Sequence, residues 1–165
     1  MTDAWEMRLG SPDDTRALGR RLAGVLRAGD VVVLSGELGA GKTTLAQGIG
    51  AGLGVRGAVT SPTFVLSRVH PGSGGGPALV HVDAYRLRGG GELDDLDLDE
   101  TLAGAVTVVE WGEGLAERLS PDRLMIRLAR SPGVDLADVR SVTVDAAGPR
   151  WAGIALRPLL EPGRG

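Results

Sequence analysis

A glycine-rich segment in the first third of the chain constrains the fold more than any other feature. It reads G-x-x-x-x-G-K-T from Gly36 to Thr43. The residues before it, 31–34, are all Val or Leu, which predicts a buried parallel strand. Apolar residues recur at helical spacing after it, at Leu45, Ile49 and Leu53. Because this motif binds phosphate groups where it joins a strand to a helix, we interpret the segment as a phosphate-binding loop.

The residue types in this loop suit a polyphosphate. Glycine permits positive φ and a close approach of the backbone to a ligand, and it occurs at Gly36, Gly39 and Gly41. Successive N–H groups then form an anion-binding nest at the start of the helix. Lys42 is the only lysine of the chain, which fits a need for a point charge on the β- and γ-phosphates. The Thr43 hydroxyl is expected to bind Mg²⁺, so the loop predicts a nucleoside triphosphate with its metal.

Two later apolar runs each end in a carboxylate. Asp83 follows the run 79–82, and Glu110 follows the run 106–109. Ligands of open α/β sheets bind at the carboxyl ends of the strands, so both side chains are expected beside the loop. We expect Asp83 to support Mg²⁺, directly or through water, and Glu110 to orient or deprotonate the attacking water and to serve as a metal ligand. The alternative for each is a surface carboxylate at a strand end.

Three further residues have weaker interpretations. Thr63 follows Pro62 and is a candidate for a switch-like hydroxyl near the γ-phosphate, with a simple turn residue as the alternative. His81 is interpreted as a histidine packed within a strand rather than as a catalyst. Trp111 is interpreted as a core or rim aromatic residue.

Composition excludes several classes of function. The net charge is −3 and no stretch is densely basic, so if the chain acts in an RNA pathway we expect another subunit to hold the RNA. No apolar run approaches the ~20 residues of a membrane span, and we expect no membrane association and a cytoplasmic location. The two histidines are far apart and cysteine is absent, which argues against a transition-metal enzyme.

The whole pattern predicts one α/β domain over residues 1–165. We expect a three-layer phosphate-binding-loop fold with a largely parallel sheet and one or more antiparallel strands from a hairpin over 64–82. A helix is expected to begin at Ser11-Pro12, with Ser as the N-cap. The helix after the loop contains three glycines, so it must be held by packing and its end is expected to be weak. Further strands are expected at 5–9, 124–128 and 142–144, and short helices at 115–119 and 154–160.

Four ordered blocks carry a resemblance to a known family. They are GELGAGKTT, SPTF, HVDAYRL and VEWGE, and they span residues 36–44, 61–64, 81–87 and 109–113. Together they resemble the bacterial TsaE family, although Gly112 stands where that family commonly has proline. The resemblance implies an ATPase required for threonylcarbamoyladenosine formation on tRNA. It also implies two protein partners, the threonylcarbamoyl-transferring subunit and the paralogue of that subunit, with tRNA contacted only through them.

The resemblance also implies roles for individual residues. It places metal binding at Thr43, Asp83 and Glu110, and it gives Thr63 a role. The ATP contacts it implies are Glu37, Leu38, Gly39, Ala40, Gly41, Lys42, Thr43 and Thr44.

Three functions compete for this set of motifs. The first is an ATPase subunit of a tRNA-modifying complex, whose hydrolysis is slow unless a partner completes the site. The second is a small-molecule kinase, which would need an acceptor pocket and an arginine-bearing lid; Arg86 and Arg88 are the only candidates near the site. The third is a nucleotide-gated interaction module without turnover. A GTPase is disfavoured because the chain contains no asparagine for an Asn-Lys-x-Asp guanine site.

Overall fold

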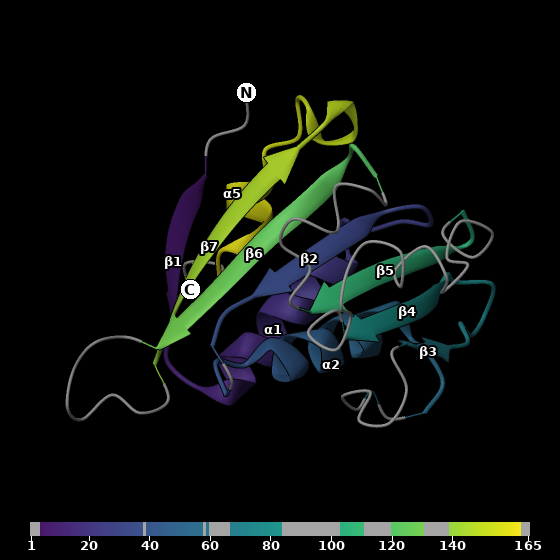
Figure 1. The fold of residues 1–165 in the computed structure, drawn as a ribbon, viewed down its shortest axis with the longest axis horizontal. Helices are drawn as coiled ribbons and strands as arrows, with labels where there is room; N and C mark the ends of the chain where they lie inside the picture. The colour runs from purple at the N-terminus through teal and green to yellow at the C-terminus, as the bar shows by residue number, and fades with distance from the viewer. Residues whose placement is uncertain are drawn as a thin grey trace.

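A single mixed sheet organises the molecule. The computed structural model describes residues 4–37, 39–57, 59, 67–83, 103–110, 120–130 and 139–162. Within these ranges the sheet has seven strands in the order β1-β7-β6-β2-β5-β4-β3 (Figure 1). The strands are β1 Trp5–Leu9, β2 Val31–Ser35, β3 Ser67–His70, β4 Ala78–Asp83, β5 Ala105–Glu110, β6 Arg123–Arg130 and β7 Arg140–Ala147.

The parallel pairs lie at the centre of this sheet. The strand before the glycine loop, β2, pairs in parallel with β5 on one side and with β6 on the other, and β4 pairs in parallel with β5. The antiparallel pairs β1–β7, β6–β7 and β3–β4 complete the two edges. The predicted α/β class with a parallel centre is therefore confirmed, and the antiparallel hairpin expected over 64–82 is the β3–β4 pair.

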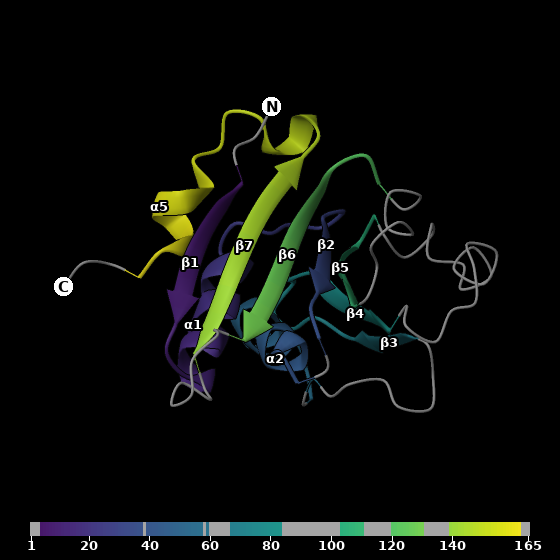
Figure 2. The same cartoon turned by 60° about the vertical axis from the view of Figure 1, so that its left-hand side comes forward.

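The described α helices pack on one face of the sheet. They are α1 Pro12–Ala23, α2 Lys42–Leu53 and the short α5 Leu156–Leu160, and a 3₁₀ turn, η3, covers Pro149–Trp151 (Figure 2). Side chains from all three helices and from β1, β2, β4, β5, β6 and β7 form one buried cluster on this face. The helix expected at 115–119 lies outside the described residues, and the described helices do not include one on the other face of the sheet.

Helix α1 begins as the sequence predicts. Ser11 is its N-cap, and the Ser11 hydroxyl accepts a hydrogen bond from the Asp14 N–H at 3.1 Å. Pro12 occupies the first turn, where a backbone N–H would have no partner within the helix. The missing N–H of proline therefore costs no hydrogen bond there. The first turn also carries Asp13 and Asp14, whose charges complement the positive end of the helix.

The glycines of α2 have a packing reason. A Cβ on Gly48 would lie 2.3 Å from the carbonyl oxygen of Arg16 in α1, and one on Gly19 of α1 would lie 2.7 Å from the Cα of Gly48. The backbones of α1 and α2 therefore lie so close together at this point that only glycine, which has no side chain, fits between them. Packing holds the helix, as predicted, and α2 continues to Leu53, where Gly54 closes it in the left-handed conformation.

Candidate functional site

The glycine loop joins the end of β2 to the start of α2. Gly36, Gly39 and Gly41 all adopt positive φ, with values of 142°, 79° and 108°. At Gly36 the space is also closed, because a Cβ there would lie 2.2 Å from the carbonyl oxygen of Leu128 in β6. Gly41 is the N-cap of α2, so the first N–H groups of the helix adjoin the loop. The local geometry has the turn and the free helix end that the motif requires.

Lys42 extends back over the loop from the first turn of α2. Its Nζ donates to the carbonyl oxygens of Gly36 at 2.7 Å and Glu37 at 2.9 Å. Burial lowers the pKa of the Lys42 ammonium group from its ordinary value, and the negative charges of Glu110 and Asp83 oppose that change. A buried cation thus lies between the loop and the two carboxylates at the strand ends.

Glu110 meets the loop from the end of β5. Its side chain is 5% exposed, and Thr43 Oγ1 donates to Glu110 Oε1 at 3.3 Å. The parallel pairing of β2 with β5 brings this about, because Leu34 lies opposite Glu110, two residues before the loop begins. The expected proximity of Glu110 to Thr43 is therefore present in the structure.

Asp83 is the last residue of β4, the strand next to β5, and it is level with Glu110. It lies opposite Glu110 in the parallel β4–β5 register, and its side chain is half-buried. Parallel neighbours are about 4.8 Å apart, so the two carboxylates share one edge of the sheet. Together with the Thr43 hydroxyl they form the set of hard oxygen donors that suits Mg²⁺, which binds through one or two carboxylates and completes its shell with phosphate oxygens and water.

The remaining predicted site residues divide into two groups. In the loop, Glu37 is exposed, Ala40 is buried and Thr44 is half-buried. Thr44 lines a hollow of about 80 Å³ together with Pro12, Thr15, Gly39, Gly41 and Arg140. Leu38 and Thr63 lie outside the described residues, as do Trp111 and the arginines considered for a kinase lid.

Two residues at the site have contacts that the sequence analysis did not assign. His81 is packed within β4, as predicted, but its Nε2 also lies 2.7 Å from Glu110 Oε2. Period-two alternation places His81 on the same face of β4 as Asp83, and the register of β4 on β5 then decides its contact with Glu110. Arg140, at the start of β7, donates from Nε to the Ala40 carbonyl at 3.0 Å and from its terminal nitrogen to the Gly39 carbonyl at 3.3 Å. No local pattern connects residues a hundred positions apart, so this contact needed the structure.

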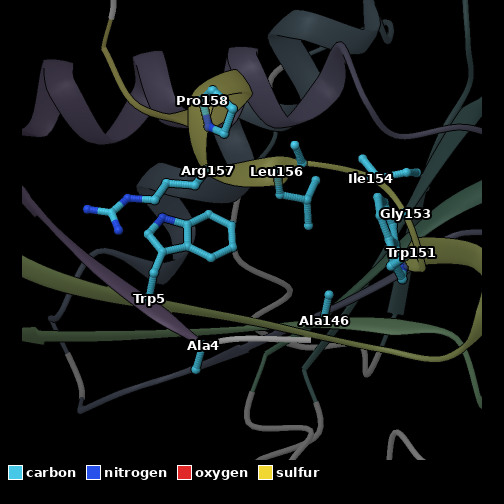
Figure 3. A pocket seen from close by; sticks show the side chains of 10 residues that line it. Ala4, Trp5, Ala146, Trp151, Gly153, Ile154, Leu156, Arg157 and Pro158 are labelled. Carbon is cyan, nitrogen blue, oxygen red and sulfur yellow. The ribbon is translucent and has the colours of Figure 1, made fainter. Parts of the chain in front are cut away.

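A larger hollow lies at the β1 edge of the sheet. It has a volume of about 460 Å³ and is lined by residues that include Trp5, Ala146, Trp151 and Leu156 (Figure 3). None of its described lining residues belongs to the predicted site. In the part of the chain that the structure describes, no helix combines the length and the apolar character needed to cross a lipid bilayer.

These features define a class: a single-sheet α/β protein whose glycine-rich loop joins a central strand to a helix, with carboxylates at two neighbouring strand ends. The family model described as "Threonylcarbamoyl adenosine biosynthesis protein TsaE" matches residues 9–136. The chain belongs to the TsaE family, as the resemblance of its motifs indicated.

Individual relatives agree with this family. A "tRNA threonylcarbamoyladenosine biosynthesis protein TsaE" from Streptomyces coelicolor is 66% identical over 138 residues, which cover 83% of this chain and 93% of the relative. A protein of the same name from Bacillus subtilis is 38% identical over 145 residues, 87% of each chain. The crystal structure of YdiB from Bacillus subtilis superposes with a TM-score of 0.72 at 33% identity, covering 92% of this chain and 90% of that one.

Proposed function

We propose that this protein is a Mg²⁺-dependent ATP-binding and ATP-hydrolysing subunit that acts in threonylcarbamoyladenosine modification of tRNA. The observation that carries the proposal is the meeting of Lys42, Thr43 and Glu110 at the carboxyl ends of β2 and β5. A cation, a hydroxyl and a carboxylate come together there at the start of a helix, which is the arrangement that phosphoryl transfer to water needs.

In this proposal the loop and Lys42 bind the phosphates. N–H groups of the loop would bind the anionic oxygens, while Arg140 donates to the carbonyls of Gly39 and Ala40. Thr43, Asp83 and Glu110 would hold Mg²⁺, which neutralises developing charge on the phosphates when bound. Glu110 accepts a proton from the attacking water or fixes its orientation.

The proposal includes partner subunits and a cytoplasmic location. A net charge of −3 leaves little electrostatic attraction for a polyanion, so we propose that tRNA binds to the partners. We propose that these partners are the threonylcarbamoyltransferase subunit and its paralogue, because the chain belongs to a family of threonylcarbamoyladenosine biosynthesis proteins. The isolated domain offers few groups for the transition state, so its hydrolysis is expected to be slow until the partners are present.

Reconstitution tests this function. The two partner subunits, tRNA and the threonylcarbamoyl donor are combined with or without this protein and ATP, and modified tRNA is counted per complex. We expect repeated turnover only when both are present. ADP formation that depends on a small-molecule acceptor and not on the partners, with the phosphate transferred to the acceptor rather than released, would instead support the kinase.

Lys42→Ala is expected to weaken ATP binding by about 10- to 100-fold, the range for losing a charge-assisted hydrogen bond of ~1.5–3 kcal/mol. Titration calorimetry measures the affinity, and circular dichroism checks that the fold is retained. Lys42→Arg is the matched control for charge, and it should not restore wild-type affinity, because a planar guanidinium does not replace a compact ammonium group. Unchanged affinity in Lys42→Ala would contradict the assignment of the loop.

Asp83→Asn is expected to weaken nucleotide binding in Mg²⁺ more than in EDTA, because Asp83 is proposed to act through the metal. The affinity of the wild type and of the variant is measured in both buffers, and the loss in Mg²⁺ is divided by the loss in EDTA. Equal losses in both buffers would make Asp83 a structural carboxylate at the end of β4.

A further inference from the structure

His81 is a buried polar residue directly behind the proposed site. It lies in the middle of β4 with its side chain fully buried, opposite Val108 of β5 in the parallel register. Glu110 is two residues beyond Val108, so His81 and Glu110 face the same side of the sheet. The 2.7 Å separation of His81 Nε2 and Glu110 Oε2 is short enough for a strong hydrogen bond to a carboxylate.

The surroundings of the ring decide which nitrogen carries the proton. Among the described residues, no hydrogen-bond partner reaches His81 Nδ1, which is buried. A carboxylate oxygen can only accept, so Nε2 must be the donor. In the neutral ring Nδ1 is then the bare nitrogen, which needs no acceptor of its own.

The two oxygens of Glu110 have different partners as a result. Oε2 accepts from the imidazole behind it, and Oε1 accepts from the Thr43 hydroxyl at the loop. A glutamate side chain has several rotatable bonds and would otherwise sample many rotamers. With Oε2 fixed, Oε1 stays directed toward the loop.

We propose that His81 is a positioning residue, whose Nε2–H holds the Glu110 carboxylate in the orientation that acts on the attacking water. This inference rests on the proposed function of Glu110. Outer partners of functional carboxylates typically change activity by about 10- to 100-fold when they are removed. The effect should be on the rate of the chemical step rather than on ATP affinity, since the loop and Lys42 supply most of the nucleotide contacts.

The test compares two substitutions of His81 whose side-chain amides lie at different distances from Cβ. The terminal amide nitrogen of glutamine lies about as far from Cβ as Nε2 of histidine, whereas that of asparagine matches Nδ1. In the reconstituted complex with ATP and Mg²⁺, we expect His81→Asn to lower kcat for ATP hydrolysis by about 10- to 100-fold with little change in KM. His81→Gln should recover most of that loss. Equal activities in the two variants, whether both normal or both impaired, would overturn the inference.

His70 provides a matched control on the adjacent strand. It is also a buried histidine, on β3, and no hydrogen bond joins it to Glu110 in the described part of the chain. His70→Gln is expected to keep kcat within about threefold of wild type, and its thermal melt is compared with those of the His81 variants.

A second measurement needs neither nucleotide nor activity. The sequence has two histidines, so His70→Gln leaves the His81 ring as the only imidazole. Nitrogen-15 NMR of that variant should show a proton on Nε2 and none on Nδ1, and adding Glu110→Gln should shift the Nε2–H signal. A proton on Nδ1, or an unchanged signal, would overturn the contact even if His81→Asn fails to fold. If the wild type does not hydrolyse ATP while the NMR result holds, the proposed function fails and the contact remains.

Discussion

Glu110→Gln is expected to lower ATP hydrolysis by about 100-fold or more, the usual scale for losing a general base, while ATP binding stays near the wild-type value. The amide has nearly the shape of the carboxylate, so its carbonyl oxygen can still accept from His81 while its NH₂ group donates to the Thr43 hydroxyl. It cannot accept a proton from water. Single-turnover hydrolysis in the complex and calorimetric titration with ATP separate the two effects.

The same variant tests the division of labour between subunits. Glu110→Gln should still join its partners in the ATP-bound form and then fail at the step that hydrolysis triggers, so tRNA modification stops after one turnover. Glu6→Gln removes an equal charge from the edge strand β1 and is the control for net charge. Wild-type hydrolysis in Glu110→Gln would reduce Glu110 to a carboxylate at a strand end. Tight tRNA binding by the isolated protein would contradict the inference drawn from its charge.

Gly48→Ala is expected to destabilise the fold by about 3 kcal/mol, the upper part of the usual range for overpacking. Helix propensity alone predicts the opposite sign, since alanine is favoured over glycine by about 1 kcal/mol in a helix interior. The added methyl group would lie 2.3 Å from the Arg16 carbonyl oxygen and 2.9 Å from the Arg16 Cα, so α1 and α2 must separate. Urea unfolding measures the change as a lower midpoint with an unchanged slope.

Gly104→Ala is the matched control for this prediction. Apart from its chain neighbours, no atom of the described residues lies within 4 Å of the position of a Cβ at Gly104, which precedes β5 in a turn. The free energy of unfolding of Gly104→Ala should stay within about 0.5 kcal/mol of the wild-type value. If Gly48→Ala proves as stable as Gly104→Ala, the close approach of the two helices is not a constraint on the fold.

Local patterns predicted the elements that meet at the site. The all-apolar run before Gly36 is buried throughout, as a parallel strand between two neighbours should be, and Ser11 caps α1 through its hydroxyl. Asp83 and Glu110 ended their strands in the sequence and do so in the structure. These features depend on residues close together in the chain, where periodicity and capping rules apply directly.

Long-range contacts could not be predicted in the same way. The position of β6 beside β2 brings the Leu128 carbonyl against Gly36, and no motif near either residue encodes that pairing. From the sequence alone, the glycines of α2 could be interpreted only as a loss of helix propensity, because the surface that Gly48 packs against belongs to α1. His81 could be predicted to pack within its strand, but the glutamate it contacts could not be identified, since the register of β4 on β5 decides that contact.

The pairing of β1 with β7 has a consequence during synthesis. Trp5 lies opposite Val144, so β1 cannot pair with β7 until about 140 more residues have been translated. At 5–20 residues per second this takes roughly 7 to 30 s. Throughout that interval the apolar side of β1, with Trp5, Met7 and Leu9, has no sheet to join. Until β7 arrives, α1 can cover this strand, because side chains of α1 belong to the same buried cluster as Met7 and Leu9.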